Sequence, residues 1–578
     1  MRGKNKELNI AHQLYLVGCL RKRARSYQVV NDGMANFKAR ASMNPSNDQI
    51  LHPQDSTSPE VTTPTGVIRG SFEKGIYSFK GIRYAAPIEG VNRWLAPQPP
   101  ANHSAALDAN QFGPSAPQLV PSVPDWMMPK AGVAMMKMMS GMTETGADCL
   151  SLNIWTPAIK QENGEKLPVI FWIHGGGLAS GGSSLVSMDG AHLAGRGKVV
   201  VVSINYRLGG IGFLAGDGLF EDNICDGNRG FMDLVAGLKW VSQNIEQFGG
   251  DPDSVTIVGQ SAGGTCVWAL LSSPTTEGLF HRAVVMSGPI VMINISDHHK
   301  FTRDVLKEMK VPVGDVEALG EVSDDVIVSA KPQTMLYRSG EPYGEMSRIR
   351  LPAAGAYNTE FMPEDVLKAM ANARIRNIDL LIGNCKHDGR VAVVPMPLPK
   401  SIAIRVGNSM FNGLFGDTKA DRKKLIAAYR SALPDSDSYS ILERVQSDGL
   451  YRMRSIQAAE THSTTSNGKT YMYQFEYETQ GLKGAFGAFH GFDSAFMFNN
   501  LSVLGEVLGD EKSMEEAQSL ADSITDAWSA FAYTGRPASS DLPEWPEYEA
   551  AQRQTMMLNR RSEVLVDPDS HIRKIWAK

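Results

Sequence analysis

The chain has 578 residues, of which 21% are charged, and a net charge of −5. The Lys and Arg residues are too scattered to form a nucleic-acid-binding face, and no apolar run is long enough to span a membrane. The five cysteines lack regular spacing, which argues against a disulfide framework or a zinc site. We therefore expect no nucleic-acid partner and no membrane span. Because free cysteines suit a reducing compartment, we also expect a cytoplasmic location.

The first 60 residues differ from the remainder of the chain. They contain the short basic cluster Arg21-Lys22-Arg23 and then a stretch rich in Pro, Ser, Asp, Gln and Thr, without an apolar core of signal-peptide length. We interpret residues 1–60 as a disordered leader, with a mitochondrial-type leader as the alternative because Arg and Lys are frequent there. Residues 61–578 are expected to form a single domain.

Strand and helix patterns then alternate along the chain. Period-two patterns at residues 65–70 and 76–79 predict paired edge strands, and one apolar stripe predicts a helix over residues 227–247. Continuous apolar runs predict buried strands at 168–173, 199–204, 255–258, 283–286, 378–382 and 471–475. Such strands indicate an α/β fold with a mostly parallel sheet covered by helices on both faces. Residues 304–370 and 401–461 are interpreted as helical insertions that cap a pocket above the sheet.

One short motif stands between a predicted strand and a predicted helix: Gly259-Gln260-Ser261-Ala262-Gly263. Its glycines allow a sharp turn in which Cβ atoms would otherwise collide, and the turn exposes the Ser261 hydroxyl. The backbone N–H of Ala262 would lie beside it. The alternative is a glycine-rich connector with an ordinary serine.

A second motif, His174-Gly175-Gly176-Gly177, directly follows the predicted strand that ends at residue 173. Consecutive glycines leave backbone amides bare, so Gly176 and Gly177, together with Ala262, are candidates for an oxyanion hole. A flexible glycine turn is the alternative. A serine nucleophile also requires a histidine base and a carboxylate that orients it.

Ordered matches over residues 60 to 578 make the chain resemble the type-B carboxylesterases of the α/β-hydrolase superfamily, which include cholinesterases and p-nitrobenzyl esterases. The matching segments are Phe79-Lys80-Gly81-Ile82-Arg83, Asp148-Cys149-Leu150-Ser151, Asn205-Tyr206-Arg207, Phe248-Gly249-Gly250-Asp251-Pro252 and Thr534-Gly535-Arg536-Pro537. The resemblance implies an α/β-hydrolase fold with an active-site gorge. It also implies serine-dependent hydrolysis of small to medium hydrophobic esters through an acyl-enzyme, without a metal or organic cofactor.

The resemblance also assigns partners to Ser261. His490 lies in a glycine- and aromatic-rich segment that resembles the family's segment around its base. Asp388 occupies the position of the family's acidic residue, usually Glu, in Gly383-Asn384-Cys385-Lys386-His387-Asp388-Gly389. Glu364 and Asp365 are the alternative acids. Ser287 resembles a serine that supports the acid and the base, and a turn serine is the alternative.

Several residues depart from the cholinesterase pattern. Gln260 stands where cholinesterases carry Glu, and Cys149 lacks the nearby cysteine that would complete the family's first disulfide. A choline ester is therefore a poor candidate substrate. A methionine-rich stretch between residues 126 and 142 could form an adaptable rim of the gorge, or a helix packed into the core.

Three further alternatives concern chemistry. Asp297-His298-His299-Lys300 could suggest a metal site, but adjacent histidines point apart and no third ligand is evident, so we assign it to a solvated loop. The site could transfer an acyl group to an alcohol or amine instead of water. The chain could also be a non-catalytic binding protein, because the family includes members without the triad. The oligomeric state cannot be inferred from the sequence.

Overall fold

The structure is a computed structural model that describes residues 58–577, except 120–129, 160–163, 221–226, 331–334, 338–348, 352, 373–374, 376 and 393–418. The contacts divide the chain into two units, Met1–Thr57 and Ser58–Lys578. Almost all of the predicted leader therefore lies outside the described residues, as does the beginning of the insertion predicted at 401–461. The description below concerns the second unit.

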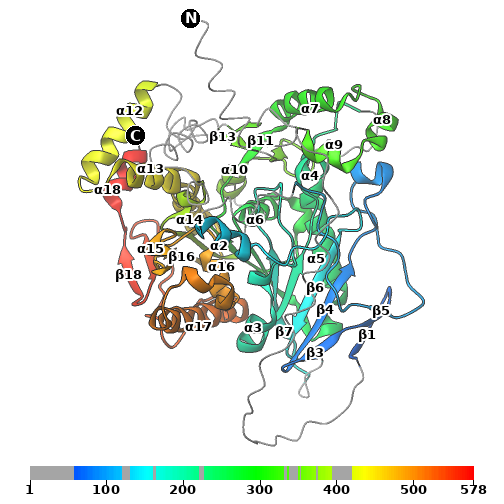
Figure 1. Cartoon of the computed structure of the whole chain (residues 1–578), viewed down its shortest axis with the longest axis horizontal. Helices are drawn as coiled ribbons and strands as arrows, with labels where there is room; N and C mark the ends of the chain where they lie inside the picture. Colours follow the sequence, from blue (N-terminus) through cyan, green and yellow to red (C-terminus); the bar gives the residue numbers. More distant parts are fainter. Residues whose placement is uncertain are drawn as a thin grey trace, which may run out of the picture. The chain divides into compact units, whose positions relative to one another are not determined.

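Eleven of the described strands form one central sheet (Figure 1). Its neighbouring strands run parallel from β8 (Val200–Ile204) through to β17 (Gln554–Leu558), and antiparallel pairs complete both edges. The strands in spatial order are β18 (Glu563–Val566), β17 (Gln554–Leu558), β16 (Thr470–Phe475), β15 (Asp379–Cys385), β10 (Arg282–Met286), β9 (Gly250–Gln260), β7 (Leu167–Ile173), β8 (Val200–Ile204), β6 (Ser151–Thr156), β4 (Ile76–Arg83) and β3 (Ser71–Glu73).

Helices cover both faces of this sheet. In β7, Val169, Phe171 and Ile173 belong to one apolar cluster, whereas Ile170 and Trp172 belong to another. The first cluster includes α5 (Arg229–Asn244) and α6 (Ala262–Ser272); the second includes α3 (Ala191–Gly197) and α17 (Glu511–Thr534). Alternation along a strand sends successive side chains to opposite faces, so a wholly apolar strand is stable only between two helical layers. This confirms the predicted buried, mostly parallel sheet.

One strand pairing was predicted wrongly. Strand β2 (Gly66–Arg69) does not pair with β4 but joins β1 (Glu60–Thr63) and β5 (Leu107–Asp108) in a separate sheet. The chain changes sheets at Gly70, where an added Cβ would lie 2.5 Å from the Phe79 ring. The next segment, β3, then occupies the edge beside β4.

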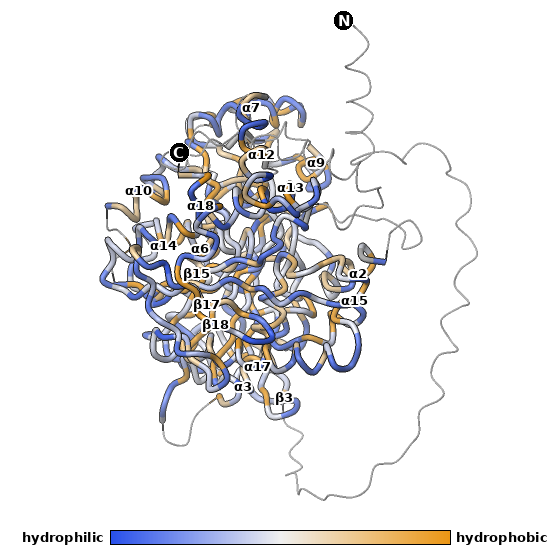
Figure 2. The backbone as a smooth tube through the Cα atoms, turned by 90° about the vertical axis from the view of Figure 1, so that its left-hand side faces the viewer, coloured by the Kyte–Doolittle hydropathy of each residue, from blue (hydrophilic) through white to orange (hydrophobic). Residues whose placement is uncertain are grey.

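Each of the two predicted insertions contains several helices. The first is not purely helical, because it also holds the short strands β12 (Met335–Tyr337), β13 (Ile349–Leu351) and β14 (Gly355–Tyr357) beside α8 (Val316–Glu321), α9 (Asp324–Ser329) and α10 (Val366–Ala371). The described part of the second contains α12 (Lys419–Ala432), α13 (Ser438–Ser447), a π-helical turn (Asp448–Arg452) and α14 (Met453–Thr465). In Figures 1 and 2, α9, α12 and α13 lie at the same end of the sheet.

The segment containing His298 and His299 is helical, so its assignment to a solvated loop was wrong. It belongs to α7 (Ile295–Met309), whose first turn is capped by the Asn294 side chain accepting from Ser296 N. His298 is fully buried, and its Nε2 lies 3.0 Å from the carbonyl oxygen of Ala354. An Asn N-cap signals this helix start, and the sequence interpretation overlooked it.

Candidate active site

Ser261 is the single residue between β9 and α6, and it has a strained backbone with φ of 57° and ψ of −123°. The two motif glycines make this turn possible. A Cβ on Gly259 would lie 2.2 Å from the Gly263 carbonyl oxygen, and one on Gly263 would lie 2.1 Å from that of Ile173. No side chain fits at such distances. The predicted strand, sharp turn and helix are therefore present, and they hold Ser261 in a conformation typical of functional sites.

Asp388 and His490 are brought together from residues far apart in the sequence. Asp388 begins a 3₁₀ turn (Asp388–Ala392) just after β15, and His490 precedes α16 (Phe492–Met497). The Asp388 Oδ1 and His490 Nδ1 atoms lie 2.6 Å apart. Glu364 and Asp365 have other partners: Glu364 accepts from Asn372 Nδ2, and Asp365 caps α10. Asp388 is thus the carboxylate that contacts His490.

The second oxygen of Asp388 is also hydrogen-bonded. Its Oδ2 accepts from the Ser287 hydroxyl at 3.0 Å and from the Cys385 N–H at 3.1 Å. Burial raises the pKa of Asp388, and the hydrogen bonds from His490, Ser287 and Cys385 counteract that effect. Ser287 follows β10, at the place predicted for a serine that supports the acid. Its φ of 46° shows that it lies in a sharp turn.

The other ring nitrogen of His490 faces Gln260 instead of Ser261. Gln260 Nε2 lies 3.1 Å from His490 Nε2, whereas the Ser261 hydroxyl makes no hydrogen bond with any described residue. Because Asp388 is only an acceptor when ionised, Nδ1 carries the proton of the neutral imidazole. Nε2 therefore carries a lone pair and no proton.

Tyr451 was not predicted. Its ring centroid lies 4.8 Å from that of His490, with the planes tilted by 39°. The residue sits in the π-helical turn Asp448–Arg452, which inserts one residue into an otherwise helical run. Such turns are often found at functional sites, but no local sequence pattern predicts them.

The glycine loop after β7 has no room for a side chain at Gly176. A Cβ on Gly176 would lie 1.8 Å from the Ser180 carbonyl oxygen, so that position tolerates glycine alone. His174 is buried, which lowers its pKa to about 4, and its ring stacks on Tyr206 at 4.6 Å. Among the described residues, the N–H groups of Gly176, Gly177 and Ala262 donate no hydrogen bond. They are thus unoccupied donors near Ser261.

His387 joins the loop that carries the acid to the loop that carries the base. Its N–H donates to the Ala488 carbonyl at 3.0 Å, and its Nδ1 accepts from the Ala488 N–H at 3.0 Å. Burial and the neighbouring Arg390 lower its pKa to about 2, so the imidazole stays neutral and able to accept. No role was predicted for His387, which stands next to Asp388 in the sequence.

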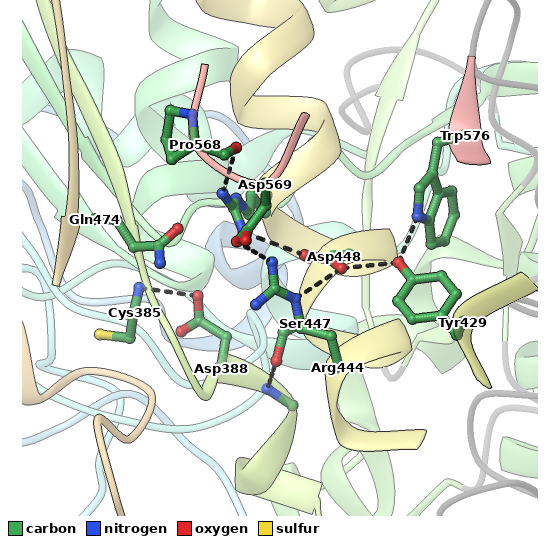
Figure 3. A network of polar contacts seen from close by, with 12 residues as sticks. Cys385, Asp388, Tyr429, Arg444, Ser447, Asp448, Gln474, Pro568, Asp569 and Trp576 are labelled. Atoms are coloured by element: carbon green, nitrogen blue, oxygen red, sulfur yellow. Dashed lines mark hydrogen bonds and ion pairs between the residues drawn. The ribbon is translucent and has the colours of Figure 1, made fainter. Parts of the chain in front are cut away.

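A polar network continues from the acid loop into the second insertion (Figure 3). The Gly389 N–H donates to Ser447 Oγ at 2.8 Å, and the Ser447 hydroxyl donates to Glu443 Oε1 at 2.7 Å. Burial raises the pKa of Glu443 to about 7. On the same helix, Arg444 bridges Asp448 and Asp569, at 2.9 and 2.6 Å. The residue after Asp388 is therefore anchored to α13.

The structure describes part of the methionine-rich stretch and one of the cysteines singled out in the sequence. Residues 126–128 of the methionine-rich stretch lie outside the described residues. In and after α2 (Lys130–Met138), Met135 and Met138 pack against the core, whereas Met139 is 41% exposed. Cys149 is a buried free thiol. In the described part of the chain, no group of three or more His, Cys, Asp or Glu residues could hold a metal ion, and no helix is long and apolar enough to cross a membrane.

Comparison with known proteins places this geometry in a family. The sequence profile of the carboxylesterase family matches residues 57–574. The para-nitrobenzyl esterase of Bacillus subtilis (strain 168) is 31% identical over 515 residues, which cover 89% of this chain and 97% of that protein. The phenmedipham hydrolase of Pseudarthrobacter oxydans is 30% identical over 496 residues, or 86% and 94% of the two chains.

Solved structures agree with this assignment. A carboxylesterase of Geobacillus stearothermophilus superposes with a TM-score of 0.74 at 30% identity, covering 89% of this chain and 99% of that one. A PNB esterase superposes with a TM-score of 0.71 at 28% identity, covering 90% and 100%. The predicted α/β-hydrolase fold is confirmed. The chain therefore belongs to the carboxylesterase family and is a carboxylic ester hydrolase.

Proposed function

We propose that the chain hydrolyses small to medium hydrophobic carboxylic esters through an acyl-enzyme formed on Ser261. The observation that carries this proposal is the 2.6 Å contact between Asp388 and His490 beside a strained serine at a strand–helix turn. Asp388 orients His490 and stabilises its imidazolium form. His490 takes the hydroxyl proton of Ser261 as that oxygen attacks the ester carbonyl.

The backbone N–H groups of Gly176, Gly177 and Ala262 donate hydrogen bonds to the carbonyl oxygen and stabilise the negative charge that develops on it. They suit this role because they have no other acceptor among the described residues. One such donor contributes a factor of about 10²–10³ in rate. The alcohol leaves with the proton from His490, and water then attacks the acyl-enzyme while His490 acts as base. No step in this scheme requires a metal or organic cofactor.

One feature argues against a cationic substrate. Gln260 is neutral where cholinesterases carry Glu, so no carboxylate from that residue favours a cationic substrate. The relatives are named for different substrates, para-nitrobenzyl esters, phenmedipham, pyrethroids and cocaine among them, so family membership alone does not select one. Acyl transfer to an alcohol or amine uses the same residues and is distinguished by product analysis. A cytoplasmic location stays a prediction.

The test is hydrolysis of p-nitrophenyl esters from acetate to long acyl chains by the parent protein and by Ser261→Ala. We expect parent activity that declines with chain length, loss of turnover in Ser261→Ala, and stoichiometric labelling of Ser261 by an organophosphate. A folded parent without ester hydrolysis or labelling would contradict the proposal and favour a non-catalytic binding protein. Retained activity in Ser261→Ala would reject Ser261 as the nucleophile.

A further inference from the structure

The Gln260 side chain contacts Nε2 of His490, the ring nitrogen that the proposed mechanism assigns to the Ser261 proton. Gln260 Nε2 lies 3.1 Å from His490 Nε2, and the Ser261 hydroxyl has no hydrogen-bond partner among the described residues. We propose that Gln260 is a positioning residue that holds the neutral base between turnovers and releases its lone pair to Ser261 when an ester binds. This inference rests on the proposed function.

The direction of the Gln260 hydrogen bond follows from the other end of the ring. Asp388 Oδ1 lies 2.6 Å from Nδ1, so Nδ1 carries the proton of the neutral imidazole and Nε2 has only a lone pair. A contact at Nε2 therefore needs a donor, and the amide NH₂ of Gln260 is one. The Glu that cholinesterases carry at this position has no proton to donate when ionised, so it cannot replace Gln260 in this contact.

Two glycines form a cradle for the Gln260 side chain. A Cβ on Gly175, in the glycine loop, would lie 2.9 Å from Gln260 Oε1, and one on Gly491, next to His490, would lie 3.2 Å from Gln260 Nε2. Gln260 itself is only 6% exposed. The carboxamide is thus confined between the loop that offers the oxyanion donors and the loop that carries the base. This confinement explains why it reaches Nε2 instead of solvent.

The consequence is a specific dependence on pH. Gln260 donates to the neutral imidazole but not to the imidazolium, whose Nε2 carries a proton. The bond therefore stabilises the resting enzyme while the imidazole of His490 is neutral, and it is lost when Ser261 takes the lone pair. It slows acylation wherever His490 is neutral in the free enzyme. Wherever the free enzyme instead holds the imidazolium, Gln260 has no such effect.

The experiment compares pH profiles of kcat/KM for p-nitrophenyl acetate in the parent, Gln260→Met and Gln260→Glu, from about pH 5 to about pH 9. We expect Gln260→Met to equal the parent at low pH and to exceed it about fivefold on the plateau, the factor that one hydrogen bond contributes. The midpoint of the fall in kcat/KM on the acid side of the profile then moves to a pH that is higher by about 0.7 units. In Gln260→Glu the added carboxylate stabilises imidazolium and moves this midpoint further, by about one unit or more.

The matched control is a glutamine far from the base. Gln243→Met, at an exposed position of α5, should reproduce the parent profile. The other titratable groups around His490 are Asp388, Asp493, Tyr451 and Cys385, and they are identical in all variants. A Gln260→Met profile lowered equally at every pH would indicate a structural role and overturn the proposal, as would a profile that overlays the parent. Failure of the proposed function would appear separately, as a parent that neither hydrolyses esters nor labels at Ser261.

Discussion

Asp388 has both carboxylate oxygens engaged within the protein, one by His490 and the other by Ser287 and Cys385. An amide in its place would present an NH₂ group to one of these donors. Asparagine would then favour the wrong tautomer of His490, leaving its Nε2 protonated and unable to act as base. The carboxylate is therefore needed for its charge and for its exclusive role as acceptor.

We predict that Asp388→Asn lowers kcat for p-nitrophenyl acetate by a factor of about 10⁴ while leaving the fold intact. Asp365→Asn is the matched control, because that residue caps α10 and asparagine caps almost as well. Steady-state kinetics on both variants provide the measurement. Comparable activity in Asp388→Asn and the parent would show that another carboxylate serves His490.

Among the elements that contain no predicted site residue, the π-helical turn Asp448–Arg452 contacts the site through Tyr451, which lies against the face of His490. We predict that Tyr451→Phe retains kcat/KM, whereas Tyr451→Leu lowers it about three- to tenfold, since a ring pair contributes about 0.5–1.5 kcal/mol. Kinetics of the two variants with one ester series test this. Equal activity of the Leu and Phe variants would mean that the ring contact does not position the base.

The C-terminal helix α18 (Ser570–Trp576) is joined to the second insertion by charged residues. Asp569, at its N-cap, accepts from Arg444 at 2.6 Å and from Arg452 at 2.8 Å, and Trp576 donates to the Tyr429 hydroxyl at 2.5 Å (Figure 3). Burial raises the pKa of Asp569, but the two guanidinium groups outweigh it and lower the pKa overall. The carboxylate is therefore ionised at neutral pH.

We predict that Asp569→Asn lowers the free energy of unfolding by about 2 kcal/mol, a value reduced from that of a fully buried pair because the side chain is one-third exposed. Asparagine keeps the left-handed backbone of this position, where φ is 55°. A lowered melting temperature at neutral pH, with the difference shrinking as Asp569 becomes protonated in acid, is the expected result. Equal melting temperatures at neutral pH would contradict it.

Across the whole molecule, buried acids make stability depend on pH near neutrality. Burial raises the pKa of Glu443 from 4.5 to about 7 and that of Asp493 from 3.8 to about 6. A raised folded-state pKa contributes stability that is complete below the unfolded value and is lost as pH rises through the folded value. Both groups therefore favour the folded state more at pH 4 to 5 than at pH 8.

We predict that Glu443→Gln removes the larger of these two contributions. Between about pH 4.5 and about pH 8, the unfolding free energy of the variant should increase relative to that of the parent by roughly 3 kcal/mol. Urea denaturation at several pH values measures it. Parallel pH profiles for the two proteins would show that Glu443 does not titrate in this range.

The sheet, the serine turn and the glycine loop could be predicted because each is encoded locally. Apolar runs identify the buried strands, and Gly259 and Gly263 flank Ser261 in the same five residues, so short-range sterics determine the turn. The positions of His490 and Asp388 required resemblance to a family, since 102 residues separate them and no local pattern pairs them. Residues 297–300 were predicted as a solvated loop, whereas the Asn294 side chain caps a helix that begins there.

By itself, the sequence determined the fold class and the sharp turn that carries Ser261, because strand periodicity and glycine sterics act over a few residues. The tertiary structure decided which groups surround the base: Asp388 at Nδ1, Gln260 at Nε2 and Tyr451 on the ring face. These contacts join four separate segments of the chain. Their geometry depends on how the sheet, the second insertion and the loops pack together, and such long-range packing has no local signature in the sequence.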